Sequence, residues 1–252
     1  MLFFNKKTTI ASSGILQGAA DCHSHILPGV DDGVETMDEA LHILSRYEEL
    51  GIKRLWLTPH VMEEIPNTPA KLKERFAELQ AAYTGSIELH LAAEYMIDNH
   101  LSKLLQDCHS EPQGGISTPK ENALLPIGTK GNHLLVETSY FNPPMRMHET
   151  LQCIKSMGYH PLLAHPERYI YMDNAEYRRL HGEGVKFQLN IASLAGGYGK
   201  TVKKKAQWLL KEGMYTVLGS DLHSEDAIEF ITNCKLGKEE TEAINSLMKN
   251  AI

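Results

Sequence analysis

The sequence predicts an α/β fold in which parallel strands close into a single-domain barrel. The chain has 252 residues, which fits one (β/α) barrel of about 250 residues. Short apolar runs alternate with longer segments whose apolar residues recur three and four positions apart, the pattern of strands followed by crossover helices. Seven such units follow one another without a break that would mark a second domain. Closure into a barrel therefore explains the sequence better than an open sheet.

The elements can be placed in order along the chain. The strands are expected to end near His25, Pro59, Ala93, Glu137, His165, Ile191 and Ser220. The clearest helical patterns are Met37 to Leu50 and Lys203 to Gly213. Glycines at positions 51, 158, 184 and 213 close helical segments, as helix stops do.

Two segments depart from this alternation. Residues 1–20 are expected to be a flexible or weakly ordered extension, and residues 21–252 the barrel domain. Thr8, Thr9, Ser12 and Ser13 interrupt the apolar stretch that a secretory signal needs, so we expect a cytoplasmic protein. Residues 107–132 are rich in Gly and Pro, which predicts a long loop.

Composition excludes several classes of protein. The 25 Lys and Arg residues against 32 Asp and Glu give a formal charge of −7, which argues against a nucleic-acid-coating protein. No apolar run approaches the roughly 18 residues that would span a bilayer. The 4 cysteines form no disulfide framework. None of them is followed by an Arg six residues later, so a Cys-x₅-Arg phosphatase mechanism is excluded.

Histidine is unusually abundant, with 13 residues. In the segment Asp21-Cys22-His23-Ser24-His25, an extended backbone places His23 and His25 on one face. Two imidazoles on one face can hold one metal ion.

The other predicted strand ends carry residues of the same kind. In a barrel, the loops that follow the strands form the active face. Six of the seven strand ends carry a metal-type ligand, and the loop after the first strand adds a carboxylate; together these are His25, Asp32, His60, Glu94, Glu137, His165, Asp221 and His223. The sequence therefore predicts a metal centre at this face.

These motifs resemble the PHP (polymerase and histidinol phosphatase) superfamily, and within it the bacterial capsule-type, metal-dependent protein-tyrosine phosphatases. The resembling stretches run in the family's order through most of residues 20–225: Asp21 to Gly33, Thr58-Pro59-His60, Ala93-Glu94-Tyr95, Leu135-Val136-Glu137, His165-Pro166-Glu167-Arg168-Tyr169, Gln188-Leu189-Asn190 and Gly219-Ser220-Asp221-Leu222-His223.

The resemblance implies a distorted (β/α)₇ TIM-like barrel with three divalent ions. It implies one ion on His23, His25, Glu94 and Asp221, a second on Glu94, Glu137 and His165, and a third on Asp32, His60 and His223. His165, Arg168 and Asp221 would be the catalytic residues, with Arg168 clamping phosphate oxygens. The substrate implied is a phosphotyrosine protein, in particular a bacterial tyrosine kinase that controls capsule or exopolysaccharide synthesis.

Physical chemistry agrees with this expectation. Mixed imidazole and carboxylate ligands suit Mn, with Fe or Zn as alternatives, better than Ca. Three divalent ions and four carboxylates leave about +2 at the site, which attracts a phosphate dianion. A metal-bridged water has a lowered pKa and can attack phosphorus.

The sequence departs from the family after Asp221-Leu222-His223, where acidic residues stand in place of a second phosphate-binding Arg. A small-molecule phosphatase of the histidinol-phosphate kind therefore stays open, as do an amidohydrolase and a non-catalytic metal-bound module. We also expect the 107–132 loop to flank the substrate cleft. Asn190 and Ser193 are candidates for the cleft rim. The run Lys203-Lys204-Lys205 is interpreted as a solvated helix start, with phosphopeptide binding as the alternative.

Overall fold

The computed structural model describes residues 7–109, 124–129 and 132–249. Strands and helices alternate through most of the chain. In order, the elements are β1 (Thr8–Thr9), α1 (Ile10–Ser13), β2 (Ala20–Ser24), α2 (Met37–Leu50), β3 (Arg54–Leu57), β4 (His60–Val61), α3 (Pro69–Ala82), β5 (Glu88–Leu91), β6 (Glu94–Met96), α4 (Asn99–His109), β7 (His133–Glu137), α5 (Met147–Ser156), β8 (His160–Leu163), a 3₁₀ turn (Pro166–Arg168), α6 (Asn174–Gly182), β9 (Lys186–Asn190), α7 (Ile191–Ala195), α8 (Gly199–Lys211), β10 (Tyr215–Gly219), α9 (Asp226–Thr232), β11 (Lys235–Leu236) and α10 (Lys238–Lys249).

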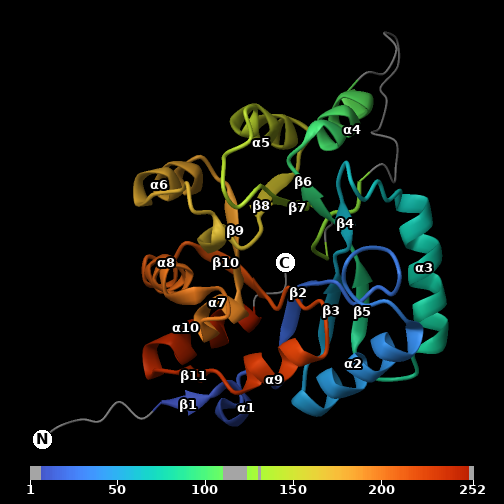
Figure 1. The fold of residues 1–252 in the computed structure, drawn as a ribbon, viewed down its shortest axis with the longest axis vertical. Coiled ribbons are helices and arrows are strands. Elements are labelled where there is room, and N and C mark those ends of the chain that lie inside the picture. The colour runs from blue at the N-terminus through green and yellow to red at the C-terminus, as the bar shows by residue number, and fades with distance from the viewer. Residues whose placement is uncertain (1–6, 110–123, 130–131, 250–252) are drawn as a thin grey trace, which may run out of the picture.

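The parallel strands form a closed ring with seven positions. One sheet has the order β2-β3-β5 and another the order β10-β9-β8-β7-β6-β4. The two sheets are continuous, because β3 leads into β4 and β5 leads into β6 after two intervening residues each. A parallel bridge between Ser24 and Leu222 joins the first and last ring strands. This confirms the predicted distorted (β/α)₇ barrel, with its helices outside the ring (Figure 1).

Local sequence signals explain where the helices begin and end. The Thr36 side chain accepts a hydrogen bond from the Glu39 backbone N–H at the start of α2, as an N-cap does. The helix ends at Gly51, whose φ of 89° is left-handed, as expected for a glycine C-cap. The helix predicted from Lys203 starts earlier, at Gly199, after a tight turn at positions 196–199.

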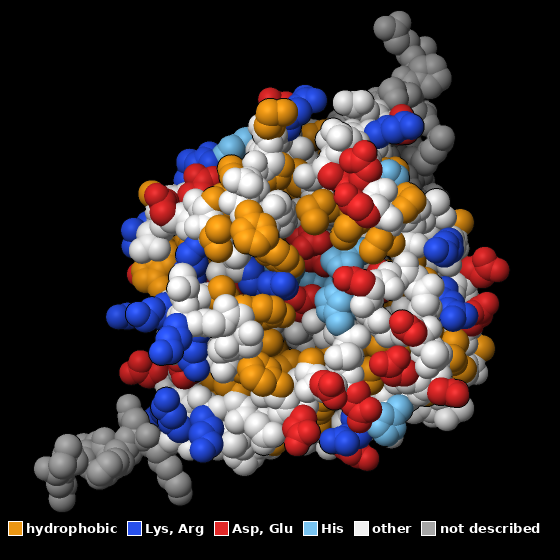
Figure 2. All heavy atoms as spheres, in the orientation of Figure 1, with side chains coloured by type: hydrophobic (Ala, Val, Ile, Leu, Met, Phe, Trp, Pro, Cys, Tyr) orange, Lys and Arg blue, Asp and Glu red, His pale blue; other side chains and the backbone are white. Residues whose placement is uncertain are grey.

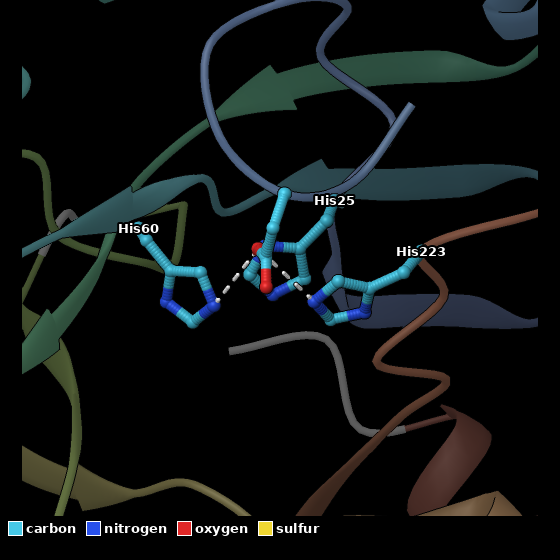
Figure 3. Close-up of side chains that lie close together, drawn as sticks. His25, His60 and His223 are labelled. Carbon is cyan, nitrogen blue, oxygen red and sulfur yellow. Dashed lines mark ion pairs between the residues drawn. The ribbon is translucent and has the colours of Figure 1, made fainter. Parts of the chain in front are cut away.

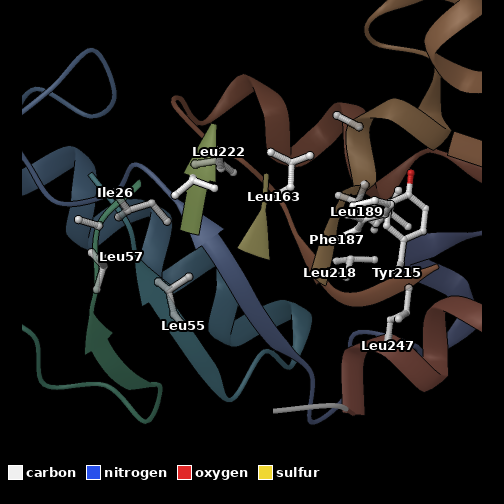
Figure 4. Packing of buried hydrophobic residues seen from close by; sticks show 14 of the residues in the cluster. Ile26, Leu55, Leu57, Leu163, Phe187, Leu189, Tyr215, Leu218, Leu222 and Leu247 are labelled. Atoms are coloured by element: carbon white, nitrogen blue, oxygen red, sulfur yellow. The ribbon is translucent and has the colours of Figure 1, made fainter. Parts of the chain in front are cut away.

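The core has two parts. The larger part lies between the strands and the helices around them and includes Leu55, Phe187 and Leu218 (Figure 4). The smaller part takes one or two residues from each ring position except β9, and we place it in the lumen of the ring. We call it the lumen plug; it comprises Cys22, Trp56, Ala92, Ile127, Leu135, Leu162, Ala164 and Val217.

The weakly ordered extension expected at residues 1–20 is wrong for its described part beyond Lys7. Strand β1 pairs antiparallel with β11, and the Ile10 N–H donates to the Cys234 carbonyl over 2.9 Å. Ile10, Ile15 and Leu16 are buried. These few apolar side chains suffice to attach the segment to the barrel, because the pairing with β11 satisfies its backbone.

The predicted loop at 107–132 lies largely outside the described residues. Helix α4 continues to His109, so the first residues of the expected loop are helical. Ile127 pairs with His133 in an antiparallel bridge and is fully buried. In the described ranges, no helix is both long and apolar enough to cross a membrane.

Candidate metal centre

The carboxyl ends of the barrel strands bring the nine predicted ligands together. Three groups have ligand atoms close enough to share an ion: His23, His25, Glu94 and Asp221; His25, Asp32, His60 and His223; and His60, Glu94 and Glu137. His25, His60 and His223 point toward one another (Figure 3). Asp32 Oδ1 lies 3.5 Å from His60 Nε2 and 3.6 Å from His223 Nε2.

Glu94 lies at the middle of the cluster. One of its oxygens, Oε2, is 3.2 Å from His23 Nε2, 3.4 Å from His25 Nε2 and 3.2 Å from His60 Nδ1. The other, Oε1, is 3.2 Å from His165 Nε2. The side chain is fully buried, and neither oxygen has a hydrogen-bond partner. A buried carboxylate without hydrogen bonds is costly, so this site calls for cations.

The separations of the donor atoms also fit a metal. His23 Nε2 and His25 Nε2 are 3.1 Å apart. Two nitrogens bound to one ion at about 2.1 Å each would be separated by roughly this distance at ordinary coordination angles. His165 Nε2 lies 3.8 Å from Glu137 Oε2. The residues therefore fit divalent ions of the kind that accept both imidazole and carboxylate.

Two of the ligands have an unusual backbone. His165 has a φ of 31° and Asp221 a φ of 54°, and among the described residues they are the only non-glycine residues with positive φ. This left-handed conformation costs about 1–2 kcal/mol for an ordinary residue. Both residues follow strand ends, where the turn aims the side chain into the cluster. Strain of this kind is concentrated at functional sites.

Close approach of the backbone explains two glycines in the motifs. A Cβ on Gly219 would collide with the Cβ of His23, and one on Gly33 would collide with the carbonyl of His25. Each glycine lets a neighbouring segment pack directly against a histidine strand. The histidines are therefore positioned by backbone contact as well as by their own strand.

Three further side chains orient the ligands. Gln188 Oε1 lies 2.9 Å from His23 Nδ1 and accepts the His165 N–H over 3.1 Å. Asp31 Oδ2 lies 2.8 Å from His25 Nδ1 and accepts the His60 N–H over 3.0 Å. Asn190 Nδ2 donates to Asp221 Oδ2 over 2.8 Å. Hydrogen bonds to the far side of a ligating group fix its tautomer and orientation.

Arg168 stands at the edge of the cluster. Its Nη1 donates to Asp221 Oδ2 over 2.7 Å. The guanidinium carbon lies 4.2 Å from the ring centre of Tyr140 and 4.1 Å from that of Tyr198. Cation–π contacts with both rings restrain the orientation of the group. The Tyr198 hydroxyl accepts a hydrogen bond from Asn190. Because Asn190 also donates to Asp221, it connects the ring that contacts Arg168 to this ligand.

The clustered charges shift one another strongly. Burial alone would lower the pKa of His23, but Glu94 and Asp221 raise it to about 9. Burial would raise the pKa of Glu94, yet His23 and His165 hold it well below its usual range. The pKa of Asp221 is likewise lowered by His23 and His25, against the effect of burial. Glu94 and Asp221 are thus kept ionised inside the protein and available to cations.

The structure differs from the expected arrangement in its grouping. His60 lies with Glu94 and Glu137 in addition to His165, the ligand that the resemblance implied there. His25 also lies with Asp32, His60 and His223. The supporting roles of Gln188 and Asp31 were not predicted, although both residues stood in the quoted motifs. A carboxylate beside a predicted histidine ligand is the signal that would have found Asp31. Tyr140 and Tyr198 were also missed.

The interpretation of the lysine run is wrong for Lys205. Its Nζ donates to the carbonyls of Tyr169 over 2.6 Å and Met172 over 2.9 Å, in the segment that follows Arg168. Lys204 is exposed. Lys205 is half-buried inside α8 because two backbone carbonyls replace the water around its ammonium group. It anchors the loop that carries Arg168.

The acidic segment after His223 packs against α2. Glu225 Oε1 lies 2.9 Å from His42 Nε2. Acidic residues stand here where the resemblance led us to expect a second Arg. Among the described residues around the ligand cluster, Arg168 is therefore the arginine that contacts a ligand directly, through Asp221.

The matching family model is described as capsular polysaccharide synthesis, CpsB/CapC, and it covers residues 19–234. The chain belongs to this CpsB/CapC family. It is 27% identical over 219 residues to tyrosine-protein phosphatase CpsB of Streptococcus pneumoniae, covering 82% of this chain and 84% of the relative. It is also 27% identical over 221 residues to tyrosine-protein phosphatase YwqE of Bacillus subtilis, covering 84% and 80%.

Solved structures agree on the fold of this CpsB/CapC family member. One reported for YwqE from Bacillus subtilis and CpsB from Streptococcus pneumoniae, described as metal-dependent tyrosine phosphatases, superposes with a TM-score of 0.71 at 22% identity, covering 92% of this chain and 95% of that one. An amidohydrolase from Mycoplasma synoviae superposes with a TM-score of 0.51 at 12% identity, covering 98% and 90%. The barrel is therefore shared by more than one class of hydrolase.

Proposed function

We propose that this protein is a metal-dependent tyrosine-protein phosphatase of capsule synthesis. The observation that carries the proposal is the buried Glu94, whose two oxygens face four histidines and have no hydrogen-bond partner. Family membership supports the capsule context, and the two curated relatives are themselves tyrosine-protein phosphatases. The amidohydrolase alternative is disfavoured because the strand ends supply Glu where those sites commonly use a bridging Lys.

Three divalent ions, with manganese as the expected metal and Fe or Zn as alternatives, would be held by the nine ligands. His23, His25, Glu94 and Asp221 would hold one ion. Glu94 and Glu137 would hold a second with His165 and His60, and Asp32, His60 and His223 a third beside His25. Divalent ions supply an activated water and neutralise charge on the phosphoryl group. The close ligand separations and the three donor groups support this assignment.

The chain's own residues complete the site. Arg168, in cation–π contact with Tyr140 and Tyr198, is the group we assign to bind phosphate oxygens, because a planar guanidinium matches them bidentately. Asp221 orients Arg168 through the 2.7 Å hydrogen bond, and His165 approaches Glu94 and Glu137. A tyrosine leaving group has a pKa near 10, so it leaves with little help from a general acid. None of the described side chains is required for that role.

The substrate would be a phosphotyrosine protein, and a bacterial tyrosine kinase that controls capsule synthesis is the partner we propose. We propose a cytoplasmic location for the same reason, since such a substrate would be met there. No nucleic-acid role is proposed, in keeping with the charge of −7.

The test is turnover by the full-length chain reconstituted with Mn²⁺, on peptides that carry phosphotyrosine or phosphoserine and on histidinol phosphate. We expect hydrolysis of the phosphotyrosine peptide, loss of activity after chelation, and recovery when Mn²⁺ is restored. Preference for histidinol phosphate would favour the small-molecule alternative. Reconstituted protein that binds metal yet hydrolyses no aryl phosphate would leave only a metal-bound binding module.

A further inference from the structure

Exposed apolar side chains gather at the mouth of the metal centre. The large hydrophobic residues that are exposed within the described chain lie in segments that follow barrel strands: Phe141 and Met145 follow β7, Ile170 follows β8, Tyr198 follows β9, and Phe230 lies in α9 after β10. Phe141 is 67% exposed and Ile170 is 61% exposed. A single exposed apolar side chain is ordinary, but a group at one rim marks an interaction surface.

These side chains form a continuous surface through Arg168. The Ile170 N–H donates to the Tyr140 carbonyl over 2.9 Å, and Phe141 is the next residue along the chain. The rings of Tyr140 and Tyr198 both contact the Arg168 guanidinium. Beyond Tyr198, Phe230 lies close enough to Gly197 that a Cβ there would sit 3.0 Å from its Cε1. We call this surface the apolar crescent, composed of Tyr140, Phe141, Ile170, Tyr198 and Phe230.

The opposite side of the mouth has the reverse character. Exposed carboxylates follow β2 and β4 there, at Asp32, Glu35, Glu63 and Glu64. Figure 2 shows hydrophobic side chains and one basic patch on one side of the hollow, and acidic and histidine side chains on the other. The crescent therefore combines apolar surface with the Arg168 guanidinium at its centre, next to an acidic wall. At its Phe230 end, a pocket is lined by both lysines and carboxylates, namely Lys7, Lys203, Lys235, Asp226 and Glu229.

We propose that the apolar crescent binds the residues flanking a phosphotyrosine in an extended polypeptide that carries large apolar side chains on both sides of it. The inference rests on the proposed function and names the substrate more closely. Charge complementarity supports this occupant, since the crescent is centred on Arg168, which pairs with Asp221 through Nη1 and is the group that the proposed function assigns to phosphate oxygens. A phosphoryl group supplies those oxygens while the neighbouring apolar side chains cover the aromatic residues.

The acidic wall argues against the other occupants. A membrane surface rich in anionic headgroups would be repelled by the exposed carboxylates of Glu35, Glu63 and Glu64, which are not among the proposed metal ligands. A second copy of a chain of charge −7 would bring a second acidic wall to the same mouth. In a neutral or basic peptide, apolar residues can pack on the crescent without bringing further negative charge to the acidic wall.

The test uses the full-length, Mn²⁺-loaded protein and two phosphotyrosine peptides. One has Phe and Leu beside the phosphotyrosine and the other has Ser and Gly. For each peptide we measure kcat/KM, and we measure Kd by fluorescence anisotropy with a non-hydrolysable phosphonate in place of the phosphate. We expect the apolar-flanked peptide to bind about tenfold more tightly and to react about tenfold faster, because flanking side chains leave water.

Two variants locate the effect. Phe141→Ser and Phe230→Ser should each bring the ratio between the peptides toward one and leave turnover of p-nitrophenyl phosphate unchanged. Ile65→Ser, on the acidic wall, is the matched control and should keep the full ratio. Equal Kd values for the two peptides on the wild-type protein would overturn the crescent proposal.

The failures of the two proposals can be told apart. If the apolar phosphonate peptide binds more tightly and Phe141→Ser removes this preference, the crescent proposal is supported even when no phosphate is released. In that case only the proposed phosphatase function is rejected. Sedimentation velocity and co-sedimentation with phosphatidylglycerol vesicles test the other occupants. A dimer or a vesicle complex that both variants dissociate would overturn the peptide assignment.

Discussion

The carboxyl ends of the barrel strands and the lumen beneath them come from the same strands, yet their chemistry is opposite. On β7, the plug residue Leu135 precedes the ligand Glu137 by two positions, and before β6 Ala92 precedes Glu94 in the same way. The plug residues are hydrophobic and buried, and the indole nitrogen of Trp56 is a buried polar atom among them. The ligand cluster instead contains ionised carboxylates, histidines without hydrogen-bond partners on one ring nitrogen, and two left-handed residues.

This contrast separates stability from function along each strand. Packing in the lumen lowers the free energy of the folded barrel. The ligand cluster costs stability in the metal-free protein, because buried polar groups without partners are unfavourable. Variants at the two ends should therefore affect different measurements.

The largest expected effect comes from the ligand end. His165→Ala should lower kcat on a phosphotyrosine peptide by on the order of 10³-fold or more, because a ligand to the centre is removed. Metal content measured by elemental analysis should fall, while the circular dichroism spectrum of the metal-free protein stays unchanged. His181→Ala, at an exposed position of α6, is the control. Full activity of His165→Ala would overturn the site assignment.

The lumen should behave in the opposite way. Leu162→Ala removes a fully buried side chain of the plug and should lower the free energy of unfolding by about 2–5 kcal/mol. Chemical denaturation measures that loss. Metal affinity and kcat of the folded fraction should stay within about twofold of the wild type. If kcat instead collapsed while stability was retained, the separation between the two ends would be wrong.

A residue that orients the ligands should have an intermediate effect. Gln188→Leu removes the acceptor for His23 Nδ1 and the His165 N–H. Loss of such a partner costs about 10- to 100-fold in metal affinity or activity. Titration of the metal-free variant with Mn²⁺ should show the weaker binding. Unchanged affinity together with an unchanged pH profile would mean that Gln188 only fills space.

The smallest effect concerns pH and the amino end of β7. Burial, with the nearby His160 and Lys186, lowers the pKa of His133 to about 4. Since an unfolded histidine titrates near 6.5, the unfolded chain binds more protons below that pH, so stability should fall between about pH 6.5 and 4. His133→Asn should flatten this part of the curve by less than about 1 kcal/mol, given the partial exposure. Unfolding midpoints at pH 7 and pH 5 test it; an unchanged pH dependence would remove His133 as the cause.

The barrel could be predicted because its signals are local. Each strand is a short apolar run, and Gly51, Gly158, Gly184 and Gly213 all adopt the left-handed φ expected of helix stops. The ligands could be predicted because each follows its own strand, so the fold alone brings His60, Glu94 and His165 to one place. Their grouping could not be predicted, because it depends on which side-chain oxygen or nitrogen turns toward which neighbour.

Contacts between distant loops escaped prediction for a related reason. Nothing near Tyr140 or Tyr198 in the sequence shows that they enclose Arg168. Lys205 belongs to a run of three lysines, and charge alone does not distinguish a solvated ammonium from one that two carbonyls hold. Ile10 and Leu16 are too widely spaced to give a periodic pattern, although both are buried.

The bridge between Ser24 and Leu222 also sets the order of events during synthesis. His23 and His25 leave the ribosome early, but Asp221 and His223 are added almost 200 residues later, about 10–40 s at ordinary elongation rates. Until then β2 has one unpaired edge and the cluster lacks its last carboxylate. The nascent chain therefore cannot assemble the complete set of metal ligands until translation is nearly finished. Such long-range closure is also expected to make folding slow.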